Sequence, residues 1–439
     1  MDSDRLIVVG AGYVGLVAGT CFASAGYKVG VVENNAQKLL SLKEGICPFY
    51  EPSLSELMKE GINAGKLKFY ADQKSAIQEL NPNFIFCAVG TPESPDGSAN
   101  LKYVEEALKE SLSIETKEDL YFVLKSTVPV GTGKKLQEIA QEKTNGKLWV
   151  VNNPEFLREG TAVSDFIRPE RVVLGGAPEA VNAVAKLYES FLLNNRPLIK
   201  TDSTSAELGK LAANLMLASR ISLVNQVARL SSATGGNIRA IERILQTDSR
   251  IGSKYLYAGL GFGGSCFPKD IKNFIHLCGV HGVESSIAQS IDTFNDEQKL
   301  FFMKDIQKEF PNPKETTISL LGLAFKPDTD DIRESPALSI AEYLYNAGYK
   351  VKVYDPKAMG NFKAWAKHLK DLSYCSNASD CLKDAKAVIL VTEWQEFQRL
   401  SADKFKSLFK GSHIYDGKNV LAGEELKKAG FTYKGIGQS

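Results

Sequence analysis

Residues 6–15 read LIVVGAGYVG, and this stretch decides the fold of the first part of the chain. The apolar run Leu6–Val9 suits a buried parallel strand, and the mostly apolar residues 16–25 can form the helix that follows. The intervening Gly10-Ala-Gly12-Tyr13-Val14-Gly15 permits a tight turn, close approach of a pyrophosphate to the helix N-terminus and close packing of helix on strand. The stretch therefore predicts the first βα unit of a dinucleotide-binding domain.

The next strand, Lys28–Val32, ends in Glu33, which lies at the distance expected for the acidic residue that binds a ribose diol. A carboxylate at this position repels a 2′-phosphate, so we expect NAD rather than NADP. One alternative is a glycine-rich turn that binds no ligand. Another is a membrane anchor, because residues 6–27 carry no charge and about 20 apolar residues can span a bilayer. Glycines interrupt that apolar run, and we expect no membrane partner.

Three further apolar runs each lead into a polar loop. Residues 84–89 precede Thr91, residues 121–124 precede Thr127, and residues 149–152 precede the loop that carries Glu155. Because ligands of open α/β sheets bind outside the carboxyl ends of the strands, Thr91 and Thr127 should face the cofactor or the substrate. These residue types are also ordinary in loops, which is the alternative interpretation.

The middle of the chain predicts one long helix. Thr204 and Glu207 form a possible capping box, and leucine and valine residues keep a helical spacing until Gly235-Gly236. The helix should extend for roughly 40 Å, bridge two domains and supply a dimer surface. Lys210 and Asn214 are four residues apart and should share one of its faces.

The second half repeats the pattern of the first. Residues 25–33, AGYKVGVVE, are echoed by residues 347–355, AGYKVKVYD. Strands are expected at 318–321, 351–354, 387–391 and 413–415, with a helix over 335–346, but GxGxxG is lacking. Residues 325–335, FKPDTDDIRES, offer cations and a helix start for a phosphate-bearing ligand; an acidic surface loop is the alternative.

We therefore expect an α/β protein in which two Rossmann-like, doubly wound parallel-sheet domains are joined by a long central helix and a helical region. The expected divisions are an NAD-binding domain at residues 1–200, a helical dimerisation region that includes Cys266 at 201–300, and a second domain for a phosphate-bearing ligand at 301–439.

Residues 261–270, GFGGSCFPKD, place Cys266 between glycines and a proline. Pro268 is favoured at the first position of a helix, so the thiol should lie where helix N–H groups stabilise a thiolate. The glycines allow a substrate to approach closely. These features indicate a nucleophile, whereas a lone cysteine without them would more often be buried and structural.

The composition excludes several classes of function. Lysine and arginine total 53 against 52 acidic residues, so no overall field favours nucleic acid or an anionic membrane. The seven cysteines include no CxxC pair or zinc spacing, which predicts no structural metal and a reducing, cytoplasmic location. None of the four histidines lies in a motif, so we do not expect histidine to be the main acid or base.

The motifs GAGYVG, VGTP, KSTVPVGT, NPEFLREG, ELGKLAAN, RIG, GFGGSCFPKD, FKPDTDDIRES and YDPK run along the chain in this order. In this combination the sequence resembles the UDP-glucose/GDP-mannose dehydrogenase family, whose members oxidise an alcohol twice to an acid. GFGGSCFPKD after Arg250-Ile-Gly favours UDP-glucose as substrate and UDP-glucuronate as product. The resemblance implies a homodimer or larger homo-oligomer through the central helix.

The same resemblance assigns roles to individual residues. It implies that Cys266 forms a covalent thiohemiacetal and then a thioester, that Lys210 and Asn214 stabilise the oxyanion, and that Asp270, Glu155 and Thr127 serve acid–base steps and hold water. The implied cofactor-binding residues are Gly10, Gly12, Tyr13, Val14, Gly15, Glu33, Lys38, Thr91, Thr127, Glu159, Gly263, Cys266 and Arg333. The implied substrate-binding residues are Glu155, Phe156, Leu157, Arg158, Lys210, Asn214, Arg250, Tyr255, Gly263, Phe325, Lys326 and Lys418.

Two departures and two alternatives accompany this resemblance. Glu33 replaces the family's more common aspartate, and Lys418 replaces an arginine, which makes contact between Lys418 and the nucleotide sugar doubtful. The same chemistry could act on GDP-mannose or a UDP-N-acetylhexosamine. An alternative of another class is a redox sensor that holds NAD without turnover.

Overall fold

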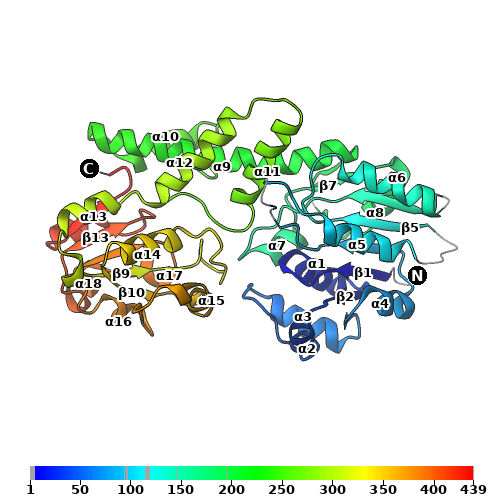
Figure 1. Ribbon diagram of the computed structural model, residues 1–439, viewed down its shortest axis with the longest axis horizontal. Coiled ribbons are helices and arrows are strands. Elements are labelled where there is room, and N and C mark those ends of the chain that lie inside the picture. The colour runs from blue at the N-terminus through cyan, green and yellow to red at the C-terminus, as the bar shows by residue number, and fades with distance from the viewer. Residues whose placement is uncertain are drawn as a thin grey trace. The chain divides into compact units, whose positions relative to one another are not determined.

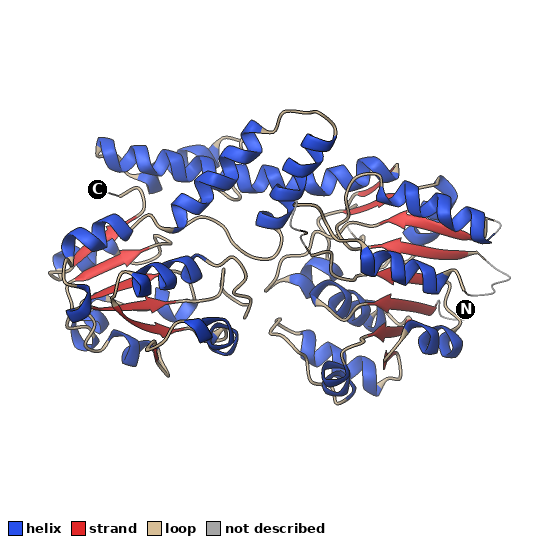
Figure 2. Ribbon diagram, in the orientation of Figure 1, coloured by secondary structure: helices blue, strands red, loops and turns tan. Residues whose placement is uncertain are grey.

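The computed structural model describes residues 5–92, 94, 97–113, 119–144, 146–193 and 195–438. The chain divides into two compact units, one formed by residues 1–213 with 276–281 and the other by residues 214–275 with 282–439. Each unit contains a sheet with helices beside its strands (Figures 1 and 2).

In the described residues of the first unit, eight strands form a sheet in the order β3-β2-β1-β4-β5-β6-β7-β8. Neighbouring strands are parallel except β6 and β7, which pair antiparallel through Asn152 and Gly175. The strands are β1 (Arg5–Val9), β2 (Lys28–Val32), β3 (Leu67–Tyr70), β4 (Phe84–Cys87), β5 (Leu120–Leu124), β6 (Leu148–Asn152), β7 (Val172–Gly175) and β8 (Leu198–Thr201). The strand order reverses between β1 and β4, which is where doubly wound sheets bind ligands.

Both faces of this sheet are covered, because alternate residues of each strand enter different cores. In β1, Leu6 and Val8 pack with α1, α3, α7 and α8, whereas Ile7 and Val9 pack with α4, α5 and α6. These helices, together with α2, are α1 (Tyr13–Ser24), α2 (Ala36–Lys43), α3 (Leu54–Asn63), α4 (Gln73–Leu80), α5 (Lys102–Ser111), α6 (Thr132–Thr144), α7 (Ala162–Ile167) and α8 (Pro178–Lys186). The stretch considered as a membrane anchor is thus β1, α1 and the turn after it. No helix in the described part of the chain is long and apolar enough to cross a bilayer.

The long helix predicted for the middle of the chain is α9 (Ser203–Thr234). Its 32 residues correspond to about 48 Å at the usual helical rise. The first part of α9 belongs to the first unit, and the part from Asn214 onward belongs to the second. Four more helices follow before the second sheet: α10 (Ile238–Thr247), α11 (Phe267–Val280), α12 (Ser286–Lys299) and α13 (Met303–Glu309).

The described residues of the second unit form a six-stranded parallel sheet in the order β11-β10-β9-β12-β13-β14. The strands are β9 (Thr317–Leu321), β10 (Lys350–Tyr354), β11 (Ser373–Tyr374), β12 (Ala387–Leu390), β13 (His413–Asp416) and β14 (Thr432–Gly435). The remaining elements are η1 (Pro313–Glu315), α14 (Pro336–Asn346), α15 (Met359–Trp365), η2 (Ala366–His368), α16 (Ala378–Leu382), α17 (Gln395–Gln398), α18 (Ala402–Leu408) and α19 (Gly423–Lys428). The order repeats that of β3-β2-β1-β4-β5-β6, so the predicted fold class is confirmed.

The two sheets differ at the acidic residue that follows β2 in the first sheet and β10 in the second. Glu33 follows β2 and accepts a hydrogen bond from the main-chain N–H of Asn35. The equivalent Asp355, after β10, is 1% exposed. It accepts hydrogen bonds from the N–H groups of Leu323, Ala324, Lys357, Ala358 and the indole of Trp394. Asp355 therefore holds together the loops at the end of the second sheet.

Candidate active site

The turn between β1 and α1 requires its glycines. Gly10 has a φ of +99°, a conformation that side chains rarely adopt, and its N–H bonds to the carbonyl of Val32 at 3.0 Å. A Cβ on Gly15 would lie 1.9 Å from the Gly10 carbonyl oxygen. The first turn of α1, which includes Tyr13 and Val14, carries no acidic side chain, so its free N–H groups and the helix dipole suit a phosphate. This local geometry fits an NAD pyrophosphate.

Glu33 and Lys38 form an ion pair next to this turn, with Oε2 and Nζ 2.7 Å apart. Glu33 is 8% exposed and lies at the carboxyl end of β2. Its Oε1 accepts from the N–H of Asn35 at 2.9 Å, so the carboxylate is fixed at the position where a ribose diol would be recognised. Both residues were predicted to contact the cofactor, and the structure places them together.

A buried carboxylate that the sequence analysis did not select joins two predicted loops. Glu51, 4% exposed, accepts a hydrogen bond from the hydroxyl of Tyr13. It also accepts from the N–H groups of Gly160, at 2.6 Å, and Ala162, at 2.8 Å, where α7 begins. Burial, followed by the hydrogen bond to Glu51 and the charges of Glu51 and Glu159, raises the pKa of the Tyr13 hydroxyl. Glu51 thus positions the cofactor loop relative to the loop that carries Glu155 and Glu159.

The loops after β4 and β5 are also joined. The hydroxyl of Thr91 donates to the main-chain carbonyl of Thr127 at 2.8 Å. Beside them lies Lys125, which is 4% exposed and donates to the Oδ1 of Asn153 at 3.1 Å. Burial, assisted by the charge of Lys210 and opposed by that of Glu155, lowers the pKa of Lys125 to about 8. Lys125 is a further residue that sequence reasoning missed.

Glu155 and Lys210 form a buried pair at the end of β6. Lys210 Nζ lies 3.3 Å from Glu155 Oε1, and both side chains are less than a tenth exposed. Oε2 of Glu155 accepts from the N–H of Leu157 at 2.6 Å, and the Lys210 ammonium lies 5.2 Å from the centre of the Phe156 ring. A cavity of about 10 Å³, enough for one water, is lined by Leu124, Ser126, Thr127, Val128, Asn152, Pro154, Glu207 and Lys210. The structure therefore brings Thr127 and Lys210 to one small cavity.

The predicted capping box of α9 is wrong. Asp202 caps this helix by accepting from the N–H of Ser205 at 2.8 Å. Glu207 instead reaches the start of α6, where it accepts from the N–H groups of Gly131, at 2.7 Å, and Gly133, at 2.6 Å. Those N–H groups need an acceptor that local sequence does not supply, so a distant carboxylate takes this role.

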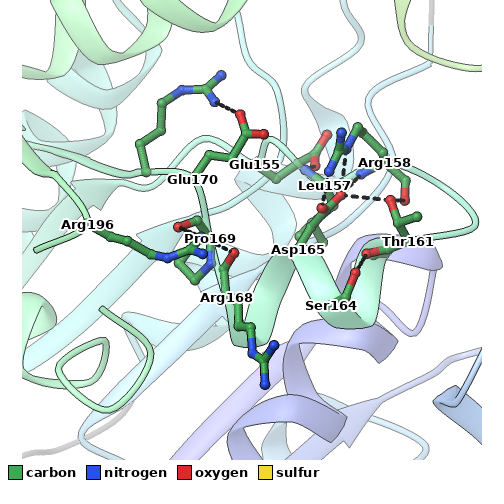
Figure 3. A network of polar contacts seen from close by, with 12 residues as sticks. Glu155, Leu157, Arg158, Thr161, Ser164, Asp165, Arg168, Pro169, Glu170 and Arg196 are labelled. Atoms are coloured by element: carbon green, nitrogen blue, oxygen red, sulfur yellow. Dashed lines mark hydrogen bonds and ion pairs between the residues drawn. The ribbon is translucent and has the colours of Figure 1, made fainter. Parts of the chain in front are cut away.

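Arg158 pairs with a residue of the helix that follows its loop, Asp165 in α7 (Figure 3). Its guanidinium binds both carboxylate oxygens of Asp165, with NH2 2.5 Å from Oδ1 and Nε 3.0 Å from Oδ2. The Arg158 N–H also donates to Asp165. In this arrangement Arg158 shapes the segment between Glu155 and α7, and its assignment as a substrate contact stays a prediction.

In the second unit, Cys266 immediately precedes α11, as predicted, although Pro268 is the second rather than the first helical residue. The carbonyl of Cys266 accepts the N–H of Asp270 at 2.9 Å. Asp270, 2% exposed, accepts from Asn214 Nδ2 at 2.6 Å and pairs with Lys269 Nζ at 2.6 Å. The partly buried thiol therefore lies one helical turn before a carboxylate that is bonded to Asn214.

The glycine-rich loop before Cys266 packs against the loop that follows β9. A Cβ on Gly263 would lie 2.2 Å from the Glu334 carbonyl oxygen, and one on Gly264 would lie 2.8 Å from the Phe325 ring. The N–H of Gly264 donates to the carbonyl of Arg333 at 2.8 Å. The glycines thus permit two predicted site loops of this unit to touch each other.

The remaining predicted site residues of this unit lie nearer the surface. Arg333 forms a bidentate pair with Asp331, and the Arg333 side chain is 61% exposed. The Nζ of Lys326 lies 5.4 Å from the centre of the Phe325 ring. Lys418 pairs with Glu393 at 3.2 Å, and Arg250 pairs with Asp248 while its side chain is 87% exposed. Tyr255 has a positive φ of 62°, and its ring centre lies 6.2 Å from that of Phe267. Their assigned contacts stay predictions.

The fold and these local sites define a dehydrogenase that uses NAD, and comparison with known proteins agrees. The chain matches the UDP-glucose/GDP-mannose dehydrogenase family in its NAD binding domain at residues 4–192, its central domain at 204–297 and its UDP binding domain at 319–423. The chain belongs to this family.

Two relatives and one solved structure match nearly the whole chain. UDP-glucose 6-dehydrogenase TuaD of Bacillus subtilis is 39% identical over 99% of this chain and 93% of its own length. UDP-glucose 6-dehydrogenase of Pseudomonas aeruginosa is 37% identical over 99% and 97%, respectively. The structure of a UDP-glucose dehydrogenase from Pyrobaculum islandicum matches with a TM-score of 0.90 and 32% identity, over 100% of this chain and 98% of that chain.

Proposed function

We propose that this protein oxidises the primary alcohol of UDP-glucose to the carboxylate of UDP-glucuronate, in two steps that use two molecules of NAD and a covalent intermediate on Cys266. The substrate is supported by the names of relatives that match over nearly the whole chain. The covalent step is supported by the position of Cys266 directly before α11, one turn from the Asp270–Asn214 pair. This position is the single observation on which the mechanism depends.

Bound NAD supplies the hydride acceptor for both oxidations. The thiolate of Cys266 attacks the aldehyde carbon, and the resulting thiohemiacetal becomes a thioester when its carbon loses a hydride. Water then adds to the thioester carbon, the carbon–sulfur bond breaks, and the sulfur leaves as thiolate. The alcohol and one water thus become a carboxylate with the loss of two hydrides and three protons.

We assign complementary roles to the other predicted side chains. Lys210 and Asn214 lie four residues apart on one face of α9, so both can donate to an oxyanion, where fixed donors contribute several kcal/mol. Glu155, within 3.3 Å of Lys210 Nζ, can accept its proton or one from water. The small cavity between Thr127 and Lys210 can hold the water that hydrolyses the thioester. Asp270, bonded to Asn214 and Lys269, orients the amide and can take part in proton transfer.

The assay that tests this function is stoichiometry. Complete conversion of a known amount of UDP-glucose should yield two NADH per sugar, and a yield of one would defeat the four-electron reaction. Cys266→Ser should bind UDP-glucose with unchanged affinity in calorimetry but lose steady-state turnover, because a serine hydroxyl is a poor nucleophile at neutral pH. Cys47→Ser, at a partly buried cysteine of the first unit, is the matched control.

The same assay separates the alternative activities. Initial rates with UDP-glucose, GDP-mannose and UDP-N-acetylhexosamines should differ by orders of magnitude, because a site that must pair the base and the sugar hydroxyls discriminates strongly. Faster turnover of another sugar would replace UDP-glucose as the substrate. A protein that binds NAD without producing NADH from any of these sugars would be the redox sensor considered above.

We further propose a cytoplasmic homodimer or larger homo-oligomer. Met216, Leu223 and Leu230 follow one another at seven-residue intervals along α9, and each side chain is more than 60% exposed. Burying this stripe against a second copy would remove apolar surface from water. Leu223→Glu should lower the mass measured by light scattering, and an unchanged mass would place the interface elsewhere. The seven cysteines, all within the described residues, have free thiols, which supports a reducing compartment.

A further inference from the structure

Two cysteines of the second unit meet at the edge of its sheet. Cys375 directly follows β11, and its N–H donates to the carbonyl of Val353 at 3.0 Å. Cys381 lies in α16, and its sulfur is 3.7 Å from the carbonyl oxygen of Leu320. Leu320 and Val353 pair in register on the neighbouring strands β9 and β10, so the two cysteines lie against adjacent positions of the sheet.

The two thiols differ in access and in charge. Cys375 is partly exposed, whereas Cys381 is 0% exposed. The hydrogen bond from Cys381, with a smaller contribution from the charge of Lys352, lowers the pKa of Cys375 to about 7; burial and the charge of Asp380 oppose this shift. The Lys352 ammonium is held beside the pair because it donates to the carbonyls of Asp380, at 2.5 Å, and Lys383, at 2.6 Å. Cys375 is therefore the thiol that a reagent from solution reaches as a thiolate.

We propose that Cys375 and Cys381 form a reversible disulfide, in which Cys375 is the thiol attacked first and Cys381 is the resolving thiol. This modification site is independent of the reaction at Cys266, because neither cysteine belongs to the loops of the candidate active site.

The oxidant is a small disulfide such as oxidised glutathione. The Cys375 thiolate attacks one glutathione sulfur, which breaks the glutathione disulfide, forms a mixed disulfide and releases one glutathione thiolate. Cys381 then loses its proton and attacks the Cys375 sulfur, and the second glutathione leaves as a thiolate that takes up this proton. Two protein thiols are oxidised, one glutathione disulfide is reduced to two thiols, and no other reactant is needed.

Peptide mapping of the full-length protein tests the proposal. The protein is incubated with oxidised glutathione at pH 7, and its remaining thiols are alkylated after denaturation. The protein is then digested, and the masses of the peptides are measured. We expect the peptide or peptide pair that contains Cys375 and Cys381 to be lighter by two hydrogen atoms and to carry no alkyl group. Glutathione that stays on Cys375, or alkyl groups on both cysteines, would overturn the proposal.

Four variants make the order of the steps measurable. Cys381→Ser should stop at the mixed disulfide on Cys375, and Cys375→Ser should leave Cys381 free for alkylation after denaturation. If Cys381→Ser does not fold, Cys375→Ser still decides, because its side chain is only partly buried. Lys352→Met should slow glutathione attachment to Cys375 several-fold at pH 7, and Lys352→Arg should restore the rate. Modification of Cys381 in Cys375→Ser at the wild-type rate would exclude the order proposed.

Discussion

Asn295, on α12, binds the main chain of Phe262 through both ends of its side-chain amide: Oδ1 accepts the Phe262 N–H at 2.8 Å, and Nδ2 donates to the Phe262 carbonyl at 3.0 Å. The amide is 3% exposed, and a Cβ on Gly261 would lie 2.5 Å from Asn295 Oδ1. The Asn295 side chain thus makes the two main-chain hydrogen bonds that a neighbouring strand would otherwise make with the loop that leads to Cys266. A buried amide bonded at both ends fixes the position of that loop.

Asn295→Asp should therefore reduce turnover by roughly tenfold or more while changing the Michaelis constant for NAD little. The new carboxylate keeps an acceptor for the Phe262 N–H, but its second oxygen faces the Phe262 carbonyl without a proton to donate, which costs about 1–3 kcal/mol. Because the loop positions Cys266, the rate at which iodoacetamide alkylates Cys266 should change together with turnover.

Gln289→Glu is the matched control, because it makes the same chemical change at an exposed residue of the same helix. If Asn295→Asp lowered thermal stability but left both turnover and the alkylation of Cys266 unaltered, Asn295 would have only a structural role.

Glu51→Gln should raise the Michaelis constant for NAD several-fold more than that for the sugar. The substitution puts an NH₂ group where Glu51 accepts from Tyr13 and from the Gly160 N–H, so the cofactor loop loses its anchor. Tyr13→Phe removes only the hydroxyl and should show a smaller shift in the same direction. Steady-state kinetics with each substrate varied in turn provides the measurement, and equal shifts for NAD and sugar would argue against a specific link to the cofactor loop.

Lys125→Met should stabilise the protein at neutral pH. Burial lowers the pKa of Lys125 from 10.5 to about 8, so holding its charge in the folded state costs roughly 3 kcal/mol below pH 8. Between about pH 8 and 10.5 the folded lysine loses its proton while the unfolded lysine keeps it, and this cost disappears. Urea unfolding should therefore find the variant more stable at pH 7 and the difference smaller at pH 10; a difference that does not depend on pH would contradict the assignment.

Arg220→Lys should weaken binding of the nucleotide sugar several-fold if Arg250 and Tyr255 contact it. The Arg220 guanidinium donates to the carbonyls of Ile251, Gly252 and Lys254 at 2.8–3.0 Å and so holds the loop that carries both residues. An ammonium group cannot match this fork of donors. Titration calorimetry with the sugar gives the affinity, and Arg229→Lys, at a partly exposed arginine of the same helix, is the control. Unchanged affinity would remove this loop from the sugar site.

Much of the fold could be predicted because its signals are local. The GAGYVG turn, the apolar strands that end in polar loops and the repeated AGYKV segments fix the class and order of the elements, since each depends on residues within one βα unit. The position of Cys266 before a helix was predictable for the same reason. Five strands were not predicted, namely β3, β7, β8, β11 and β14, and the shortest of them, β11, carries little apolar pattern.

The supporting residues of the site could not be predicted because their partners are distant in sequence. Glu51 bonds to Gly160, Glu207 to Gly131 and Asn295 to Phe262, and no short motif links the members of these pairs. Each satisfies main-chain N–H groups at a loop or helix start, a need that becomes visible only when the chain is folded. The Glu207 side chain shows the difficulty, because a local capping pattern fits its sequence but its carboxylate binds elsewhere.

The hydrogen bonds of Asp355 separate the second sheet from the first in what its acidic residue can bind. An acidic residue at this point of a nucleotide-binding fold normally binds a ribose diol, and Glu33, with one main-chain hydrogen bond and one ion pair, occupies that position in the first sheet. Both oxygens of Asp355 accept hydrogen bonds from four main-chain N–H groups and the Trp394 indole, so this carboxylate serves the structure of the second unit instead of recognising a ribose. Introducing the glycines of a GxGxxG turn would therefore not by itself give the second sheet a dinucleotide site, because Asp355 would first have to lose these hydrogen bonds.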